Sequence, residues 1–173
     1  MSFTLRPGEA IAETLPPHEA GLVFIGRIRT PWTDRTACPR QGRPDGPVCR
    51  IEIAEPWASG GALDGIEACG RLEVLYWLHL SRRDLLRQNP KHDGVLRGSL
   101  ALRSPLRPNP IGTSVVELVA REGAVLLVRG LDCVDGTPLV DLKPARGDMH
   151  PPAPPGDTVA GAQAPADGSK TCP

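Results

Sequence analysis

The chain has 173 residues, which is enough for one hydrophobic core and too few for two comfortable domains, so we expect a single folded domain. Its 20 Lys and Arg residues balance its 20 Asp and Glu residues, which excludes an overall positive field that would attract nucleic acid. The N-terminus has no apolar segment behind a basic start, and no apolar run approaches the ~20 residues of a membrane helix, so we predict a soluble, cytoplasmic protein.

The first elements along the chain show the alternation of a strand. Residues Met1–Ala20 mix proline, acidic residues and alanine without periodicity, which predicts an N-terminal arm. In Leu22–Arg29, apolar side chains alternate with Arg27 and Arg29, so this segment is predicted to be a strand. Cys49–Ile53 repeats the pattern.

The middle of the chain contains the most apolar segment. Leu72–Leu80 is an almost continuous apolar run, which predicts a central strand buried on both faces. Ser81–Gln88 is predicted to form a short helix that Asn89-Pro90 ends. Leu96–Arg103 alternates again and places Arg103 on the polar face at the end of a strand.

The last ordered elements predict a hairpin and a further strand. Thr113–Ala120 and Ala124–Arg129 are joined across Glu122-Gly123, and Thr137–Lys143 follows. About seven short strands with little helix favour an all-β fold whose sheet closes into a barrel, because closure removes the exposed edges.

These elements predict three regions. The arm covers residues 1–20, the barrel domain covers 21–144, and a tail rich in Pro, Ala and Gly covers 145–173. The tail offers few large apolar side chains, so we expect it to be dispensable for folding.

The five cysteines indicate neither a metal centre nor a disulfide framework. They are odd in number and none belongs to a CxxC pair, which predicts a reducing compartment. They are Cys38, Cys49, Cys69, Cys133 and Cys172.

The segment Ala101–Gly112 is the most informative of the chain. Three prolines restrict the backbone, so the loop has few conformations to lose when it binds a ligand. Arg103 and Arg107 present donors suited to carboxylate or phosphate, and Asn109 adds an amide. The alternative is a stiff connection whose arginines are merely solvated.

A basic cluster precedes this loop and predicts either a solvated face or an RNA contact. Its members lie within sixteen residues of one another: Arg82, Arg83, Arg87, Lys91, His92 and Arg97.

Four motifs carry a resemblance to a known family. The stretch RSPLRPNPIGTSVVEL, Arg103–Leu118, is accompanied in order by Ile25–Trp32, Cys38–Gln41 and Leu131–Pro144. This set closely resembles the TsaA/TrmO-like family, whose characterised members are S-adenosylmethionine-dependent tRNA methyltransferases acting on N6-threonylcarbamoyl-adenosine beside the anticodon. The resemblance implies a single-sheeted β-barrel, tRNA as the partner, and homodimers whose subunits share the cofactor cleft.

The resemblance also implies a set of S-adenosylmethionine contacts by position. The residues that match are Pro39, Arg40, Gln41, His79, Leu80, Arg103, Thr113, Asp135, Gly136, Thr137 and Pro138. At Leu80 the family often has a polar residue, so we expect a backbone contact there. No metal is implied.

The chemistry of these residues is consistent with a cofactor site of an unusual kind. No strand is followed by GxGxxG, so a Rossmann-type site is not expected. Arg40 or Arg103 can meet the carboxylate of the cofactor. No catalytic residue is identified, and the candidates for a general base are Asp135 and His79. The alternatives are that Asp135 begins an ordinary turn and that His79 is a core residue.

The candidate RNA contacts come from the loop and the basic cluster. They are Arg107, Arg82, Arg83, Lys91 and Arg97. Two other functions compatible with the motifs are a non-catalytic barrel that binds RNA or a nucleotide, and a methyltransferase acting on another small substrate.

The chain departs from the family pattern at its C-terminal end. After Asp141-Leu142-Lys143-Pro144 the family usually continues with an aromatic residue and a further proline, whereas this chain has Ala145-Arg146-Gly147. Asp141 and Lys143 are expected to pair on one strand face. We also expect the extra C-terminal domain of longer bacterial members to be missing.

Overall fold

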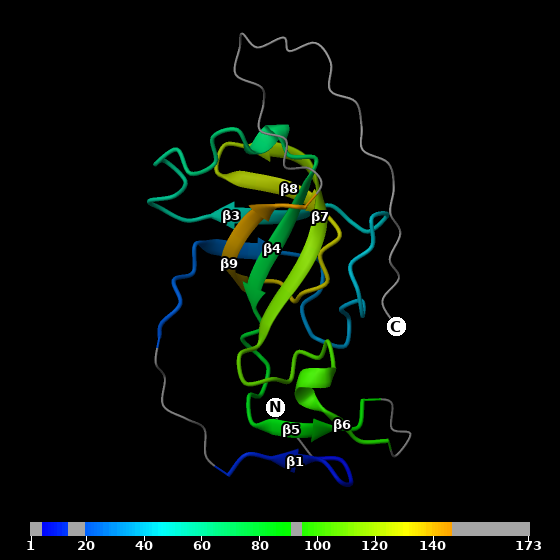
Figure 1. Cartoon of the computed structure of the whole chain (residues 1–173). Coiled ribbons are helices and arrows are strands. Elements are labelled where there is room, and N and C mark those ends of the chain that lie inside the picture. The colour runs from blue at the N-terminus through cyan, green and yellow to red at the C-terminus, as the bar shows by residue number, and fades with distance from the viewer. Residues whose placement is uncertain (1–4, 14–19, 91–94, 147–173) are drawn as a thin grey trace, which may run out of the picture.

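Six antiparallel strands close into a barrel in a computed structural model that describes residues 5–13, 20–90 and 95–146 (Figure 1). Around the barrel the order is β2-β3-β8-β7-β4-β9, and β9 pairs with β2 to close it. The strands are β2 (Gly26–Arg29), β3 (Cys49–Ile53), β4 (Arg71–Trp77), β7 (Ile111–Glu122), β8 (Val125–Arg129) and β9 (Thr137–Pro144). The predicted all-β barrel is confirmed, with six strands in its wall where the sequence predicted about seven.

The barrel closes because each strand turns one apolar face inward. In β2 and β3, Ile28 and Ile51 are completely buried, while Arg27 and Arg50 between them are exposed. The hairpin predicted between β7 and β8 forms at Gly123, whose φ of 61° suits a residue without a Cβ.

The prediction that Leu72–Leu80 is buried on both faces is wrong. The strand ends at Trp77, and burial alternates along it: Leu72, Val74 and Tyr76 point into the barrel, while the residues between them are half-buried. A single-walled barrel has its one core inside, so the outer face of β4 remains partly open to solvent.

A second, smaller sheet lies below the barrel in Figure 1. It consists of β1 (Ala10–Ile11), β5 (Leu85–Gln88) and β6 (Arg97–Gly98), with β5 in the middle. The helix predicted for Ser81–Gln88 is therefore wrong. Eight residues are too few for a stable isolated helix, and pairing with two neighbours satisfies the backbone of β5 instead.

The connection into the loop of residues 102–110, which we call the arginine loop, also differs from the prediction. Only Arg97–Gly98 is a strand, and a 3₁₀ turn, η2 (Ser99–Ala101), follows it. Arg103 consequently lies in the loop after η2 and not at the end of a strand. A second 3₁₀ turn, η1 (Ile66–Ala68), precedes β4.

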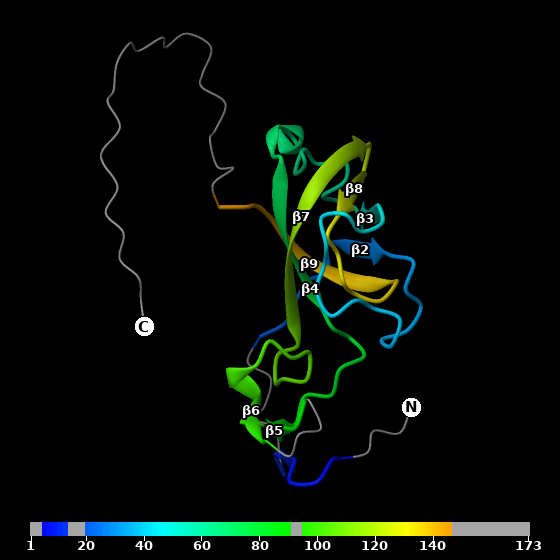
Figure 2. The ribbon, with the colours of Figure 1, turned by 90° about the vertical axis from the view of Figure 1, so that its right-hand side faces the viewer.

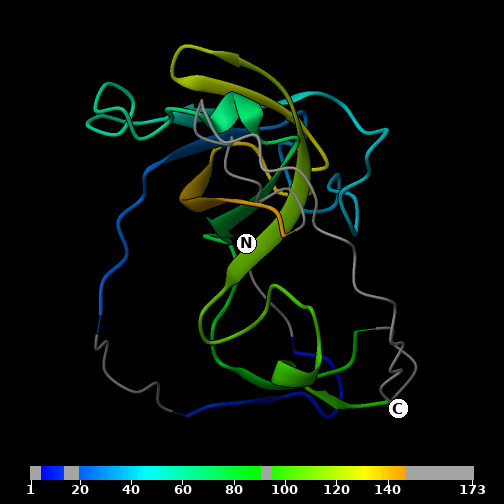
Figure 3. The same cartoon turned by 45° about the horizontal axis from the view of Figure 1, so that its top comes forward.

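Long β7 begins at the arginine loop, above the small sheet, and runs up the wall of the barrel (Figures 1 and 2). The β2–β3 connection (residues 30–48) and the β3–β4 connection project on opposite sides of the barrel (Figure 3). Ala145 is buried, and its N–H donates to the carbonyl of Arg71 at 3.0 Å. The rest of the predicted tail, from residue 147, lies outside the described residues.

Candidate functional site

The β2–β3 connection lies against the β8–β9 connection (residues 130–136) at one end of the barrel. The N–H of Gly42 donates to Asp132 Oδ2 at 3.2 Å. The N–H of Asp135 donates to the carbonyl of Trp32 at 2.7 Å, and the N–H of Thr30 donates to Asp135 Oδ1 at 3.1 Å. These contacts bring together the two segments that contain the predicted cofactor contacts Pro39–Gln41 and Asp135–Pro138.

The turn that begins at Asp135 is built by the protein itself. Gly136 has a φ of 76° and its N–H donates to the carbonyl of Ile28 at 2.8 Å. The Asp135 carboxylate also lies 3.7 Å from the guanidinium of Arg29, and Thr137 Oγ1 donates to the carbonyl of Val134 at 2.6 Å. Asp135 thus joins the start of the β2–β3 connection to the turn, which is the structural role considered as the alternative.

Asp132 is a polar centre that the sequence motifs did not single out. Its Oδ1 accepts hydrogen bonds from Tyr76 OH at 2.6 Å and Ser114 Oγ at 3.0 Å, while Oδ2 accepts from Gly42. Tyr76 OH and Ser114 Oγ also lie 2.9 Å apart. Burial, the charge of Asp132 and the hydrogen bond to it raise the pKa of Tyr76, which therefore stays protonated. The sequence could have indicated this centre, because Asp132 lies within the motif Leu131–Pro144.

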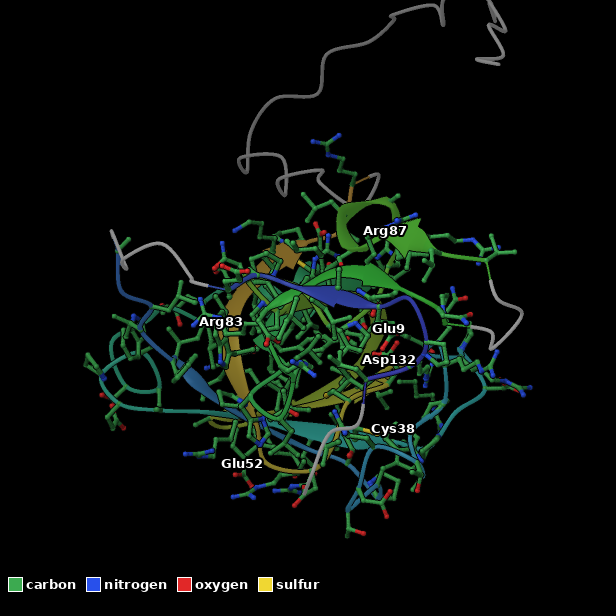
Figure 4. All side chains as sticks on the ribbon, turned by 90° about the horizontal axis from the view of Figure 1, so that it is seen from below. Glu9, Cys38, Glu52, Arg83, Arg87 and Asp132 are labelled. Carbon is green, nitrogen blue, oxygen red and sulfur yellow. The ribbon has the colours of Figure 1, made fainter. Side chains whose placement is uncertain are left out.

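Cys38 lies near this centre, as the view of Figure 4 shows. Its thiol is half-buried, and burial, followed by the charges of Asp132 and Asp34, raises its pKa. A thiol whose pKa is raised is a poor nucleophile at neutral pH.

His79 and Leu80 follow the end of β4 and are both exposed. The carbonyl of Leu80 accepts a hydrogen bond from Arg35 Nη1 at 3.3 Å, which links this segment to the β2–β3 connection. The contact expected at Leu80 was a backbone contact, and its carbonyl is accessible enough for Arg35 to reach it. His79 is not a core residue.

Two predicted cofactor contacts lie apart from this group. Thr113 is on the outer face of β7, where its Oγ1 donates to Glu73 Oε1 at 3.1 Å. Arg103 is exposed and forms no hydrogen bond or ion pair with another described residue. Arg40, in the β2–β3 connection, is likewise exposed and forms no such contact with a described residue. No hydrogen bond among the described residues joins Thr113 or Arg103 to the β2–β3 connection. The cofactor assignments therefore stay predictions.

The arginine loop (residues 102–110) is held by the buried amide of Gln88. Gln88 Nε2 donates to the carbonyl of Leu106 at 2.7 Å and to Ser99 Oγ at 2.8 Å. Gln88 Oε1 accepts from Ser104 Oγ at 2.7 Å, and Ser99 Oγ donates to the carbonyl of Leu85 at 2.7 Å. The loop is therefore preorganised by a complete hydrogen-bond network as well as by its prolines.

Of the predicted RNA contacts, Arg107 belongs to this loop and Arg83 contacts it. Arg83 Nε donates to the carbonyl of Pro108 at 2.6 Å, its Nη2 donates to Asn109 Oδ1 at 3.4 Å, and its guanidinium carbon lies 5.5 Å from the centre of the Trp77 ring. Arg107 Nη1 donates to the carbonyl of Leu102 at 3.4 Å.

The other predicted RNA contacts have different surroundings. Arg82 forms a two-pronged pair with Asp84, with both distances 2.6 Å, and this hydrogen-bonded pair lowers the pKa of Asp84. Arg97 Nη1 donates to the carbonyl of Val95 at 3.1 Å. Lys91 lies outside the described residues. At the C-terminal end of the barrel, Lys143 pairs with Asp141 as predicted.

Two hollows open on the outer surface and share Phe24. The first has a volume of about 350 Å³ and is lined by Phe24, Gly26, Arg27, Glu52, Ile53, Ala54 and Pro138. The second has a volume of about 400 Å³ and is lined by Ala20, Gly21, Leu22, Phe24, Trp77, Arg83, Asn109 and Ile111. Both volumes fall in the range of small-molecule sites. Phe24, Trp77 and Glu52 were missed as site residues because each fits an ordinary strand pattern.

The family of the chain follows from its sequence. The profile of the tRNA-methyltransferase O N-terminal domain matches residues 27–148. The chain belongs to this family. It is 53% identical over 154 residues to the probable S-adenosyl-L-methionine-binding protein VirR of Rhizobium radiobacter, covering 88% of this chain and 86% of that protein.

Two further relatives of this TrmO-family chain are a methyltransferase and a solved structure. The tRNA (adenine(37)-N6)-methyltransferase of Escherichia coli is 40% identical over 129 residues, covering 69% of this chain and 55% of the enzyme. The crystal structure of TrmO from Pseudomonas aeruginosa matches with a TM-score of 0.60 and 31% identity, covering 84% of this chain and 62% of that one. The chain thus spans little more than half of these two proteins.

The described ranges contain neither a membrane-spanning helix nor a metal-binding cluster. In residues 5–13, 20–90 and 95–146, no helix is long and apolar enough to span a bilayer. The same ranges contain no group of three or more His, Cys, Asp or Glu side chains placed to hold a metal ion.

Proposed function

We propose that this protein is an S-adenosylmethionine-dependent methyltransferase that acts in the cytoplasm on N6 of the threonylcarbamoyl-adenosine next to the tRNA anticodon. The observation that carries the proposal is that the β2–β3 connection, which contains Pro39–Gln41, contacts the β8–β9 connection through Gly42 and Asp132 and through Trp32 and Asp135, in a chain of the TrmO family. The names of the relatives support the cofactor and the tRNA substrate.

The described residues fit the proposed cofactor chemically. Arg40 and Arg103 are exposed and engaged by no described residue, so either can bind the carboxylate without breaking an existing contact. The hollow beside Pro138 adds the ring of Phe24, which suits the sulfonium of the cofactor. The Glu52 carboxylate also lines this hollow, and its Oε2 already accepts a hydrogen bond from Arg29 Nε at 2.9 Å.

The cofactor supplies an activated methyl group, and the protein has to align it with the accepting nitrogen. Alignment alone can contribute about 7 to 11 kcal/mol to lowering a barrier. The two candidates for the catalytic base are Asp135 and His79. Asp135 is already engaged by Thr30 and Arg29, whereas His79 is exposed beside Leu80 and its ring forms no hydrogen bond with a described residue.

The second hollow supports an RNA contact. The Trp77 ring, the guanidinium of Arg83 and the amide of Asn109 line it together. Asn109 Oδ1 accepts from Arg83, so the amide nitrogen is left to donate to a base or a phosphate. Aromatic rings beside arginine are the usual means by which proteins hold an unstacked base.

We also propose that the active form is a homodimer. The outer face of β7 exposes Ile111, Val115 and Val119, whose exposed fractions are 38%, 56% and 46%. Thr113, a predicted cofactor contact, lies between them and away from the other predicted contacts. A second copy seated on this face would bring its own residues to Thr113. Sedimentation of the wild type and of Val115→Glu tests this, and a wild-type monomer would contradict it.

The experiment that tests the proposed function compares two arginines of the same loop. Arg103→Ala should weaken S-adenosylmethionine binding by roughly 1.5 to 3 kcal/mol, because a charge-assisted hydrogen bond is lost. Arg107→Ala should leave cofactor affinity within about twofold, while it weakens tRNA binding and lowers the salt slope by about one.

Calorimetry with the cofactor and filter binding of tRNA at two salt concentrations provide the measurements. A wild-type protein that binds tRNA but shows neither heat nor a melting shift with saturating S-adenosylmethionine would overturn the proposal. That result would leave the non-catalytic RNA-binding barrel. Binding of the cofactor without methylation of tRNA would point to another substrate.

A further inference from the structure

Three elements of the protein converge on one carboxylate. The side chain of Asp132 accepts hydrogen bonds from Tyr76 of β4, from Ser114 of β7 and from Gly42 of the β2–β3 connection. The first two donors belong to the wall of the barrel, and the third belongs to the segment of residues 39–42. Asp132 therefore connects the long β2–β3 connection to the wall of the barrel.

The connection approaches the barrel very closely at this point. A Cβ added to Gly42 would lie 1.7 Å from the carbonyl oxygen of Gly130, so only glycine allows the backbones to meet. Among hydrogen bonds of the described residues, the one from Gly42 to Asp132 is the only one that ties residues 39–42 to the barrel.

The barrel side of the contact is equally constrained. The Tyr76 ring packs over Gly112, where an added Cβ would lie 2.2 Å from the ring. Tyr76 is 4% exposed and shares its hydroxyl between Asp132 and Ser114. The position of the carboxylate is thus fixed from the interior of the barrel, and the connection takes its position from the carboxylate.

We propose that Asp132 is a positioning residue that holds Pro39–Gln41 in the geometry needed for cofactor binding. This inference rests on the proposed function, since that function gives residues 39–41 a cofactor to bind. Asp132 acts through Gly42 and needs no contact with the cofactor itself. Its Oδ1 accepts from two hydroxyls and its Oδ2 accepts from Gly42, so an alanine at this position would remove the acceptor of all three donors.

Four variants test the proposal. Asp132→Ala and Gly42→Ala both release the connection, the first by removing the acceptor and the second by steric overlap with Gly130. Ser114→Ala removes one barrel-side donor and leaves the Gly42 contact intact. Glu122→Gln removes a carboxylate at the hairpin end of β7, where Glu122 lies 3.7 Å from Arg50, and controls for the loss of charge.

The measurements are amide exchange of a peptide covering residues 38–43 without cofactor, and S-adenosylmethionine affinity by calorimetry. Asp132→Ala and Gly42→Ala should raise the exchange and weaken the affinity at least about tenfold. Ser114→Ala should lower the melting temperature but leave both readouts within about twofold, and Glu122→Gln should change neither.

The exchange experiment separates this proposal from the proposed function. A wild type that binds no cofactor would end the proposed function, while the exchange of residues 38–43 would still report whether Asp132 holds the segment. Unchanged exchange in both Asp132→Ala and Gly42→Ala would overturn the positioning role. So would a Ser114→Ala affinity as weak as that of Asp132→Ala. If Asp132→Ala does not fold, Gly42→Ala decides alone.

Discussion

The barrel and the small sheet are stabilised in different ways. The barrel encloses one apolar cluster that includes Ile28, Val74 and Leu126, all at 0% exposure. The small sheet has Leu85 as a buried apolar side chain, and around it lie the buried polar residues Gln88, Asn89 and Ser99. Burial of apolar surface is non-directional, whereas a polar network depends on every partner being present. The two regions should therefore respond to different perturbations.

The largest effect is expected from a cavity in the barrel. Leu126→Ala should lower the free energy of unfolding by about 2 to 5 kcal/mol, because a completely buried side chain of β8 is removed. Urea unfolding measures the loss. Leu86→Ala in β5 is the control, since Leu86 is 53% exposed and should cost little. Equal losses in both variants would remove the distinction between the two regions.

Alkaline pH should weaken the barrel next. Burial raises the pKa of Cys49 from 9.0 to about 11 and that of Cys133 from 9.0 to about 12. Above about pH 9 these two thiols keep their protons in the folded state and lose them in the unfolded chain. The stability that they contribute is therefore fully present below about pH 9 and is lost as the pH rises toward 11 and 12. At about 1.4 kcal/mol for each unit of pKa, Cys49 alone accounts for more than about 2 kcal/mol.

Urea unfolding at several pH values between 8 and 11 measures this dependence. Cys49→Ala should make the pH dependence less steep, whereas Cys69→Ala, at a half-buried position, should leave it as it is. A stability that is flat over this range would contradict the assignment of these protons to the folded barrel.

A smaller and local effect is expected when the network of the small sheet is broken. Gln88→Ala leaves Ser104, Ser99 and the carbonyl of Leu106 without their partner, which should cost about 1 to 3 kcal/mol. Amide exchange should increase in residues 102–110 and remain unchanged in β3 and β8. Arg87→Ala, on the exposed side of the same strand, serves as the control. Faster exchange throughout the barrel would show that the two regions open together.

Acid pH should have the smallest effect, confined to the pairing of β1 with β5. Burial raises the pKa of Glu9, but hydrogen bonds from the N–H groups of Arg6 and Asn89 and the charges of Arg6 and Arg82 outweigh it, so the pKa is lowered. A lowered pKa gives stability that is present above about pH 4.5 and is lost as the pH falls further.

For a partly exposed group this contribution is less than about 1 kcal/mol after screening by solvent and salt. Amide exchange of residues 9–12 and 85–89 between pH 6 and 3.5 would detect it. Glu9→Gln should show the increased exchange already at pH 6, and Glu13→Gln should behave like the wild type. An unchanged Glu9→Gln would mean that the carboxylate does not hold β1 in place.

For the candidate site, as for the fold, the sequence predicts some features and the tertiary contacts decide the others. The motifs at Pro39–Gln41 and Asp135–Pro138 can be read from the sequence, because each is a local run of residues. That the two connections containing these runs meet follows only from the contacts of Gly42 with Asp132 and of Asp135 with Trp32. Arg103 was placed at a strand end by its alternation with Leu102, and the 3₁₀ turn η2 moved it into a loop.

The sequence by itself determined the family, the inward faces of the barrel strands and the hairpin at Gly123, since these depend on residue order and on alternation over a few positions. The tertiary structure decided the rest. Ser81–Gln88 has residues acceptable in a helix, yet its last four became the middle strand of a sheet, because β1 and β6 supply hydrogen bonds from distant parts of the chain. Asp132 and Gln88 became centres of networks for the same reason: their partners lie up to 90 positions away, where no local pattern can indicate them.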